Sequence, residues 1–121
     1  MATESATIED LSIQVTPSDR EAFISLSGRV TIDSSPGLRK QLHALLSQQP
    51  PPTLIVDLSE LSYIDCSGIG TLIEALRIAR QHHTKLQLRG LRDGPRHLLE
   101  VTGLLRLFDT NGEMDHSSKV P

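Results

Sequence analysis

A short polar turn near the middle of the chain brings three reactive side chains together. Asp65, Cys66 and Ser67 supply a carboxylate, a thiol and a hydroxyl in succession, and Gly68 follows them. Apolar residues then recur at helical spacing, which predicts that a helix begins at this turn and extends to about His82. Because the first amide groups of a helix lack partners and favour anions, the Ser67 hydroxyl is well placed to carry a phosphoryl group. The simpler alternative is that Asp65 or Ser67 only caps the helix.

The thiol of Cys66 offers a second kind of chemistry at the same turn. A helix start lowers the pKa of a thiol and so favours the nucleophilic thiolate. A thiol nucleophile also needs a base, and His82 on the same predicted helix lies roughly 24 Å away at the helical rise per residue. We therefore interpret Cys66 as a small side chain that packs like a hydrophobic residue.

Carboxylates and histidines elsewhere offer a third possibility, which is metal binding or acid–base catalysis. Asp57, Glu60 and Asp65 lie around one predicted strand end, but turn formation and capping explain them more simply because aspartate serves both roles. His82 and His83 are adjacent at a helix end and point in different directions, without further ligands to complete a metal site. The sequence therefore predicts no metal, no cofactor and no enzymatic activity.

The amino-acid composition argues against several classes of binding partner. The chain has 121 residues, 12 basic and 15 acidic side chains and a net charge of -3, so no cationic field favours nucleic acid or an anionic membrane. No apolar stretch approaches the roughly 20 residues of a membrane-spanning helix, and no signal-peptide pattern is present. We expect a cytoplasmic protein that is a monomer and forms transient complexes. Aromatic side chains, which would stack on bases or sugars, are only Phe23, Tyr63 and Phe108.

Strand patterns and helix patterns alternate along the chain, which is typical of an α/β domain. The segment 54–56 is apolar throughout and predicts a central strand buried on both faces, with Asp57 at its end. Other segments with strand patterns are residues 13–15, 22–27 and 86–89.

Two further helices are predicted on either side of the central one. Ser34 or Ser35 caps the first, which has Pro36 in its first turn and a leucine stripe on one side. Pro95 opens the last, and Gly103 provides a left-handed cap at its end. We expect one α/β domain over residues 11–109, with a mixed sheet of four to five strands covered by helices. Residues 1–10 and 110–121 are polar and predicted to be flexible tails.

Residues 56–72, which contain the polar turn, resemble the signature of STAS domains, the family of bacterial anti-sigma factor antagonists. The similarity extends to residues 28–30 and 36–39, which resemble the start of the family's first helix. Residues 98–104 resemble its late helix and the glycine that ends it. The resemblance covers residues 11–109 in matching order and implies a STAS-like fold.

The resemblance also implies a function and a set of site residues. A domain of this family binds an anti-sigma factor serine kinase when unphosphorylated, is released by phosphorylation of one serine, and is restored by a phosphatase, so it regulates transcription. Ser67 matches the phosphorylated serine, and the partner-binding residues would be Asp65, Cys66, Ser67, Gly68, Ile69 and Thr71.

Two positions depart from the family pattern and keep an alternative open. Cys66 stands where the family often has a first serine, and Thr31 stands where many members have an aspartate near the site. The alternative is an accessory STAS subunit of a phospholipid-transport ABC complex, which would dock on the ATPase without being phosphorylated.

Overall fold

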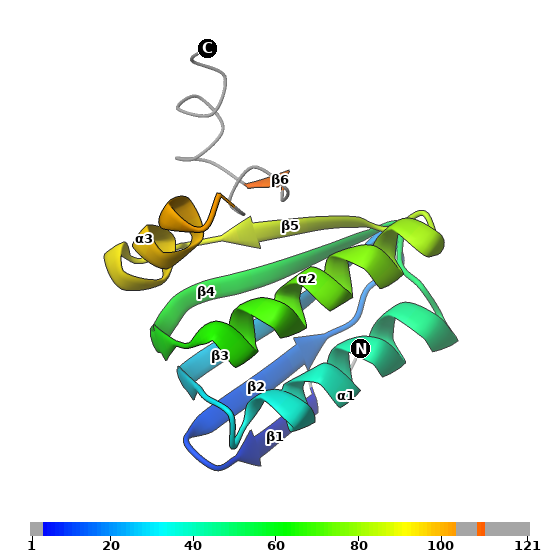
Figure 1. The fold of residues 1–121 in the computed structure, drawn as a ribbon. Helices are drawn as coiled ribbons and strands as arrows, with labels where there is room; N and C mark the ends of the chain where they lie inside the picture. Colours follow the sequence, from blue (N-terminus) through cyan, green and yellow to red (C-terminus); the bar gives the residue numbers. More distant parts are fainter. Residues whose placement is uncertain (1–3, 104–108, 111–121) are drawn as a thin grey trace.

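The computed structural model describes residues 4–103 and 109–110 and shows one mixed β-sheet with helices packed against it (Figure 1). The strands lie in the sheet in the order of the sequence. They are β1 (Glu4–Ile8), β2 (Leu11–Thr16), β3 (Glu21–Val30), β4 (Thr53–Ile64), β5 (Lys85–Arg89) and the two-residue β6 (Asp109–Thr110). The helices are α1 (Ser35–Gln48), α2 (Cys66–Gln81) and α3 (Asp93–Val101).

The pairing of the strands changes at β3. β1, β2 and β3 pair in antiparallel fashion, whereas β3, β4, β5 and β6 are parallel. Parallel neighbours need crossover connections, and α1 and α2 provide them between β3 and β4 and between β4 and β5. The predicted α/β fold with a mixed sheet is therefore confirmed, and β6 adds a short sixth strand.

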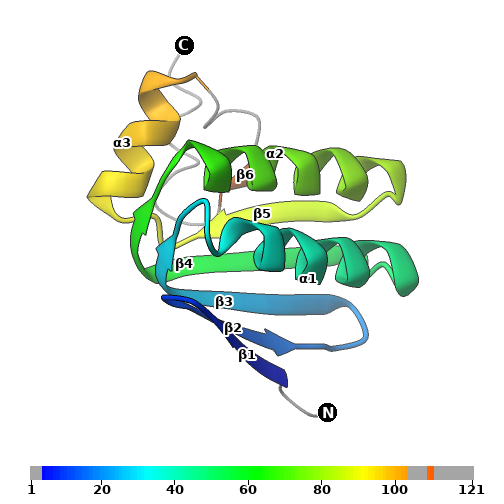
Figure 2. The ribbon, with the colours of Figure 1, turned by 60° about the horizontal axis from the view of Figure 1, so that its bottom comes forward.

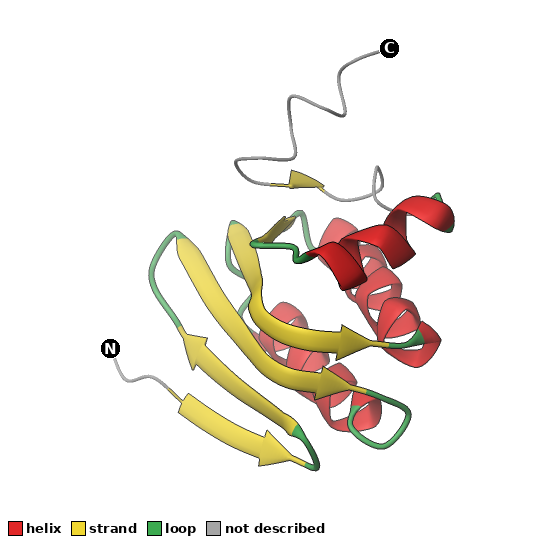
Figure 3. Ribbon diagram, turned by 90° about the vertical axis from the view of Figure 1, so that its left-hand side faces the viewer, coloured by secondary structure: helices red, strands yellow, loops and turns green. Residues whose placement is uncertain are grey.

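The helices α1 and α2 lie side by side on the same face of the sheet (Figure 3). Arg39 on α1 joins Glu74 on α2 through two hydrogen bonds, of 2.7 and 3.0 Å. The shorter α3 contacts β4 and lies beyond the end of β5 (Figure 2). In β2, Leu11, Ile13 and Val15 are buried while the residues between them are exposed. The prediction that helices cover the sheet therefore applies to one face, and the other face is polar along β2.

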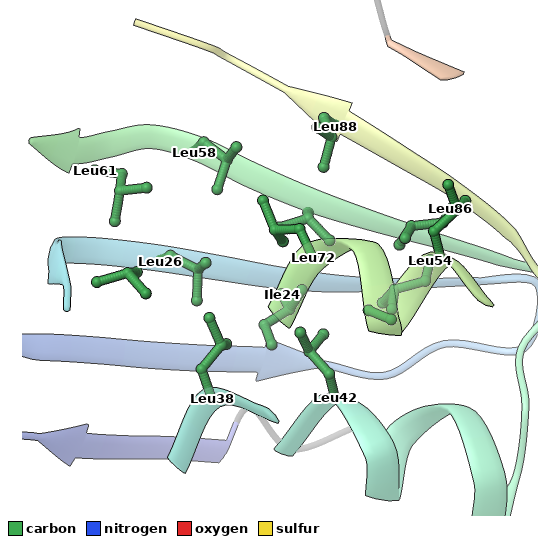
Figure 4. Packing of buried hydrophobic residues seen from close by; sticks show 14 of the residues in the cluster. Ile24, Leu26, Leu38, Leu42, Leu54, Leu58, Leu61, Leu72, Leu86 and Leu88 are labelled. Atoms are coloured by element: carbon green, nitrogen blue, oxygen red, sulfur yellow. The ribbon is translucent and has the colours of Figure 1, made fainter. Parts of the chain in front are cut away.

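The core is aliphatic and lies between the sheet and the two long helices (Figure 4). Leu38 and Leu42 point from α1 toward the sheet, and Leu72 does the same from α2. All three have an exposed fraction of 1% or less. The predicted leucine stripe of the first helix is thus confirmed, and burial of such side chains is the main stabilising term for a chain with few aromatic residues.

The strand β1 corrects the prediction that residues 1–10 are a flexible tail. Residues 4–8 pair with β2, and Ile8 packs so closely against α1 that a Cβ on Gly37 would lie 2.4 Å from its Cδ1 atom. The segment has few apolar residues, which is why its sequence pattern resembled a tail. Apart from Thr110, the predicted C-terminal tail lies outside the described residues.

The strand β4 is longer than predicted. It continues past Asp57 to Ile64, because β3 also continues past Gly28 to Val30 and pairs with it through two shifts of register. The extension matters for the candidate site, since it carries the chain directly to Asp65.

The start of α1 lies where it was predicted, but its serine has a different role. The Ser34 hydroxyl makes no cap bond to α1. It donates a hydrogen bond to the Arg29 carbonyl oxygen (3.1 Å) and accepts one from the Thr31 amide (2.9 Å). Ser34 therefore holds the loop between β3 and α1 in shape. At the end of α3, Gly103 has a φ of +75°, which confirms the predicted left-handed conformation.

Candidate functional site

Asp65 caps α2 and holds the Ser67 hydroxyl at the same time. Its Oδ1 atom accepts hydrogen bonds from the amides of Ser67 (2.9 Å) and Gly68 (3.2 Å). The Ser67 Oγ atom donates a third bond to Oδ1 at 2.5 Å. These amides are among those that a helix leaves without internal partners, so Asp65 is a side-chain cap as one of the two interpretations predicted. The Ser67 hydroxyl makes no cap bond and instead lies beside the carboxylate.

The same aspartate connects α2 to the loop between β3 and α1. The Asp65 amide donates to the Val30 carbonyl oxygen (3.1 Å), and the Ile32 amide hydrogen-bonds the Asp65 carboxylate. β3 and β4 are parallel neighbours, so the loops that follow them both emerge at the carboxyl ends of these strands (Figure 2). The candidate site therefore consists of two adjoining segments, residues 31–34 and 65–67.

The hydrogen bonds around Asp65 lower the pKa of its carboxyl group. The Ser67 hydroxyl has the largest effect, and the amides of Gly68, Ser67 and Ile32 act in the same direction, while burial opposes them. Hydrogen bonds to the charged form of a carboxyl group favour that form. Asp65 is therefore a negative charge at neutral pH, directly beside the serine hydroxyl.

A Ser67→Ala variant is expected to raise the pKa of Asp65 toward its ordinary value, because the substitution removes the strongest of these hydrogen bonds. The lowered pKa stabilises the fold above the pKa of the unfolded chain, and this contribution is lost as the pH falls through the folded value. In Ser67→Ala this pH-dependent contribution should be smaller, because the folded and unfolded pKa values of Asp65 then lie closer together. Titration of the Asp65 carboxyl carbon by NMR measures the shift.

Ser62→Ala is the matched control for that titration. Ser62 is an exposed serine whose hydroxyl donates to the Gly28 carbonyl oxygen (2.9 Å) and not to a carboxylate. Its removal should leave the Asp65 pKa unchanged. If Ser67→Ala also leaves that pKa unchanged, the backbone amides alone hold the charge and the hydroxyl is not coupled to it.

Exposure differs among the six residues predicted to bind a partner. Cys66 is exposed, and Asp65 and Ser67 are half-buried. Gly68, Ile69 and Thr71 are buried: the Thr71 hydroxyl donates to the Ser67 carbonyl oxygen (3.0 Å). The surface that a partner can reach thus contains Asp65, Cys66 and Ser67, while the other three support the turn from within.

The exposed Cys66 corrects the interpretation of this residue as a packed small side chain. Its sulfur faces solvent at the first position of α2. The next residue, Ser67, turns its hydroxyl toward Asp65. Successive side chains at a helix start point in different directions, so the Cys66 side chain lies outside the core. Sequence reasoning missed this because it treated free cysteine as a hydrophobic residue in general.

One surface residue of the site, Ile32, was not predicted from the sequence. Ile32 has an exposed fraction of 72%, the largest among the exposed large hydrophobic side chains of the described residues. It lies in the loop that bonds Asp65. The signal in the sequence was an isoleucine between Thr31 and Asp33 in a segment with no strand or helix pattern.

Of the other candidates for chemistry, Asp57 and Glu60 line one pocket, whereas Asp65 is not among the residues that line it. Asp57 accepts a hydrogen bond from the Ser59 amide (2.9 Å), which is a local role. Across residues 4–103 and 109–110, no group of three or more histidine, cysteine, aspartate or glutamate side chains could hold a metal ion. In the same part of the chain, no helix combines the length and the apolar character needed to cross a membrane.

Comparison with known proteins agrees with this fold. A family model described as "Mlab, STAS domain" matches residues 13–109. The chain therefore belongs to the STAS domain family, and the resemblance found in the sequence is confirmed.

Individual relatives carry the name of anti-sigma factor antagonists. The anti-sigma-B factor antagonist of Listeria monocytogenes is 29% identical over 110 residues, which cover 88% of this chain and 96% of the relative. Among solved structures, an anti-sigma factor antagonist from Mycobacterium paratuberculosis has a TM-score of 0.72 at 21% identity, covering 93% of this chain and 96% of the other. The anti-sigma factor antagonist SpoIIAA in its unphosphorylated form has a TM-score of 0.72 at 19% identity, covering 89% and 95%.

Proposed function

We propose that this protein is an anti-sigma factor antagonist that acts by partner switching. The unmodified chain binds an anti-sigma factor serine kinase and so frees a sigma factor. Transfer of the γ-phosphoryl group of ATP to the Ser67 oxygen, with loss of the hydroxyl proton and release of ADP, breaks that complex, and a phosphatase restores the hydroxyl by hydrolysis.

The observation that carries this proposal is the position of the Ser67 hydroxyl. It is half-buried beside the ionised Asp65 carboxylate, and Ser67 directly follows the exposed Cys66. A phosphoryl group adds a charge of about -1.5 to -2 there. The helix amides favour this charge whereas Asp65 and an acidic partner surface oppose it, so the modification changes binding more than folding.

Phosphorylation is tested directly with the serine kinase encoded in the same genome. We expect incubation with this kinase and Mg·ATP to place phosphate on Ser67, detected by mass spectrometry of peptides. Ser67→Ala should remove the signal, and Ser62→Ala, which alters an exposed serine near the end of β4, should retain it. Phosphate that persists in Ser67→Ala would contradict the assignment of the residue.

A second candidate function is that of an accessory subunit of a phospholipid-transport ABC complex. Two departures from the family pattern favour it, namely Cys66 in place of a serine and Thr31 in place of an aspartate. Both lie at the site, since Cys66 follows Asp65 and Thr31 precedes the residue that bonds it. Copurification with an ABC ATPase, together with a Ser67 that no kinase modifies, would favour this candidate over the first.

A further inference from the structure

Three large hydrophobic side chains are exposed among the described residues. The exposed fractions are 72% for Ile32, 63% for Val101 and 45% for Tyr63. Single exposed hydrophobic residues are common on protein surfaces and need no special explanation. Ile32 differs from Val101 in its position, because the loop that carries it adjoins the candidate site. The carbonyl oxygen of Val30, two residues before Ile32, accepts a hydrogen bond from the Asp65 amide (3.1 Å), and the Ile32 amide bonds the Asp65 carboxylate.

The loop that carries Ile32 is held in one shape by several hydrogen bonds. The Thr31 carbonyl oxygen accepts bonds from the amides of Ser34 (3.1 Å) and Ser35 (2.8 Å). The Asp33 amide donates to the Thr31 hydroxyl at 3.2 Å. With Asp65 bonded to the Ile32 amide as well, the backbone on both sides of Ile32 is fixed. A residue fixed in advance loses little conformational entropy on binding, which favours a tight contact.

Resting on the proposed function, we propose that Ile32 is the apolar anchor by which the kinase docks. The kinase would receive the isoleucine in a pocket lined by apolar side chains. Asp33 is exposed beside the anchor, so the rim of that pocket should carry uncharged hydrogen-bond donors. Buried apolar anchors surrounded by polar contacts supply much of the energy of protein interfaces.

This arrangement connects the anchor to the modified residue. The Ser67 hydroxyl and the Ile32 amide both bond the Asp65 carboxylate. A phosphoryl group on Ser67 removes one of these donors and places negative charge next to the carboxylate that positions the loop. Modification of Ser67 therefore acts on the anchor through Asp65 as well as by direct repulsion of the partner.

The test compares two exposed hydrophobic residues in binding to the purified kinase. Ile32→Ser should weaken binding by about tenfold or more, whereas Val101→Ser, the matched control outside the site, should stay within about twofold of the original chain. Ile32→Leu should restore most of the affinity, because it returns an apolar side chain of the same size. Circular dichroism of each variant confirms that the fold is retained.

The outcomes separate the anchor from the proposed function. Suppose that the original chain binds the kinase, Ser67→Asp does not, and Ile32→Ser binds as well as the original. The assignment of Ile32 as the anchor is then wrong, whereas the proposed switch at Ser67 is retained. If the original chain does not bind the kinase, both the Ile32 anchor and the proposed function are wrong. If sedimentation shows that the original chain forms a dimer that Ile32→Ser dissociates, a second copy of the chain covers Ile32 and the assignment to the kinase is overturned.

Discussion

A Ser67→Asp chain is expected to bind the proposed kinase partner about 100-fold more weakly than the original chain, because like charges brought together at an interface cost several kcal/mol. The substitution replaces a hydroxyl donor that is 2.5 Å from Asp65 Oδ1 with a second carboxylate. Asp65 is already ionised because its pKa is lowered. Two adjacent negative charges would then face the partner. Isothermal titration calorimetry with the purified kinase measures the change.

Ser18→Asp is the matched control for this loss of affinity. Ser18 is an exposed serine in the connection between β2 and β3, at the edge of the sheet opposite to Ser67. Its Oγ atom accepts a hydrogen bond from the Glu21 amide (3.4 Å), which an aspartate can also accept. The added charge is therefore the same and the fold is preserved. Equal weakening by Ser18→Asp and Ser67→Asp would show that net charge, not the position of Ser67, controls binding.

A Gly28→Ala variant is expected to lose about 3 kcal/mol of the free energy of unfolding, from backbone strain together with a steric clash. Gly28 has a φ of +104°, which side chains rarely allow, and a Cβ there would lie 2.1 Å from the Asp10 carbonyl oxygen. That oxygen also accepts a hydrogen bond from the Arg29 amide at 3.0 Å, so it cannot move away freely.

The same substitution at Gly70 should have the opposite effect. A Cβ at this helical position in α2 meets nothing within 4 Å. Gly70→Ala is therefore expected to stabilise the chain by about 1 kcal/mol, the difference in helix propensity between the two residues. Urea denaturation of both variants gives the two values. A Gly28→Ala variant as stable as the original would mean that the β1–β2 turn shifts without cost.

The helices were the most predictable part of the fold, for a physical reason. The start of α2 was predicted because Asp65 is a good cap residue and the apolar residues after it recur at helical spacing. Both signals are local in sequence, and the structure places the helix at Cys66–Gln81 as they indicated. The start of α1 near Ser34 and Pro36 was predicted in the same way.

The strands were less predictable because pairing depends on distant residues. Residues 4–8 form β1 only because β2 offers hydrogen bonds and α1 offers Ile8 a packing surface at Gly37. β4 continues to Ile64 because β3 runs beside it to Val30. Neither partner is visible in a local pattern of apolar residues.

The candidate site was predicted in part. The sequence indicated the Asp65 to Ser67 turn, since its residue types are local features. It did not indicate that the Ile32 amide bonds Asp65, because that contact joins two loops 33 positions apart in the chain. It also did not indicate that Cys66 faces solvent.

Three hydrogen bonds meet at the single oxygen Oδ1 of Asp65, and two of them come from backbone amides and not from the Ser67 hydroxyl. In the proposed phosphorylation the Ser67 hydroxyl no longer donates to that oxygen, but the amides of Ser67 and Gly68 remain as donors. We therefore expect α2 to keep its cap, and the chain to stay folded, through repeated cycles of modification and hydrolysis.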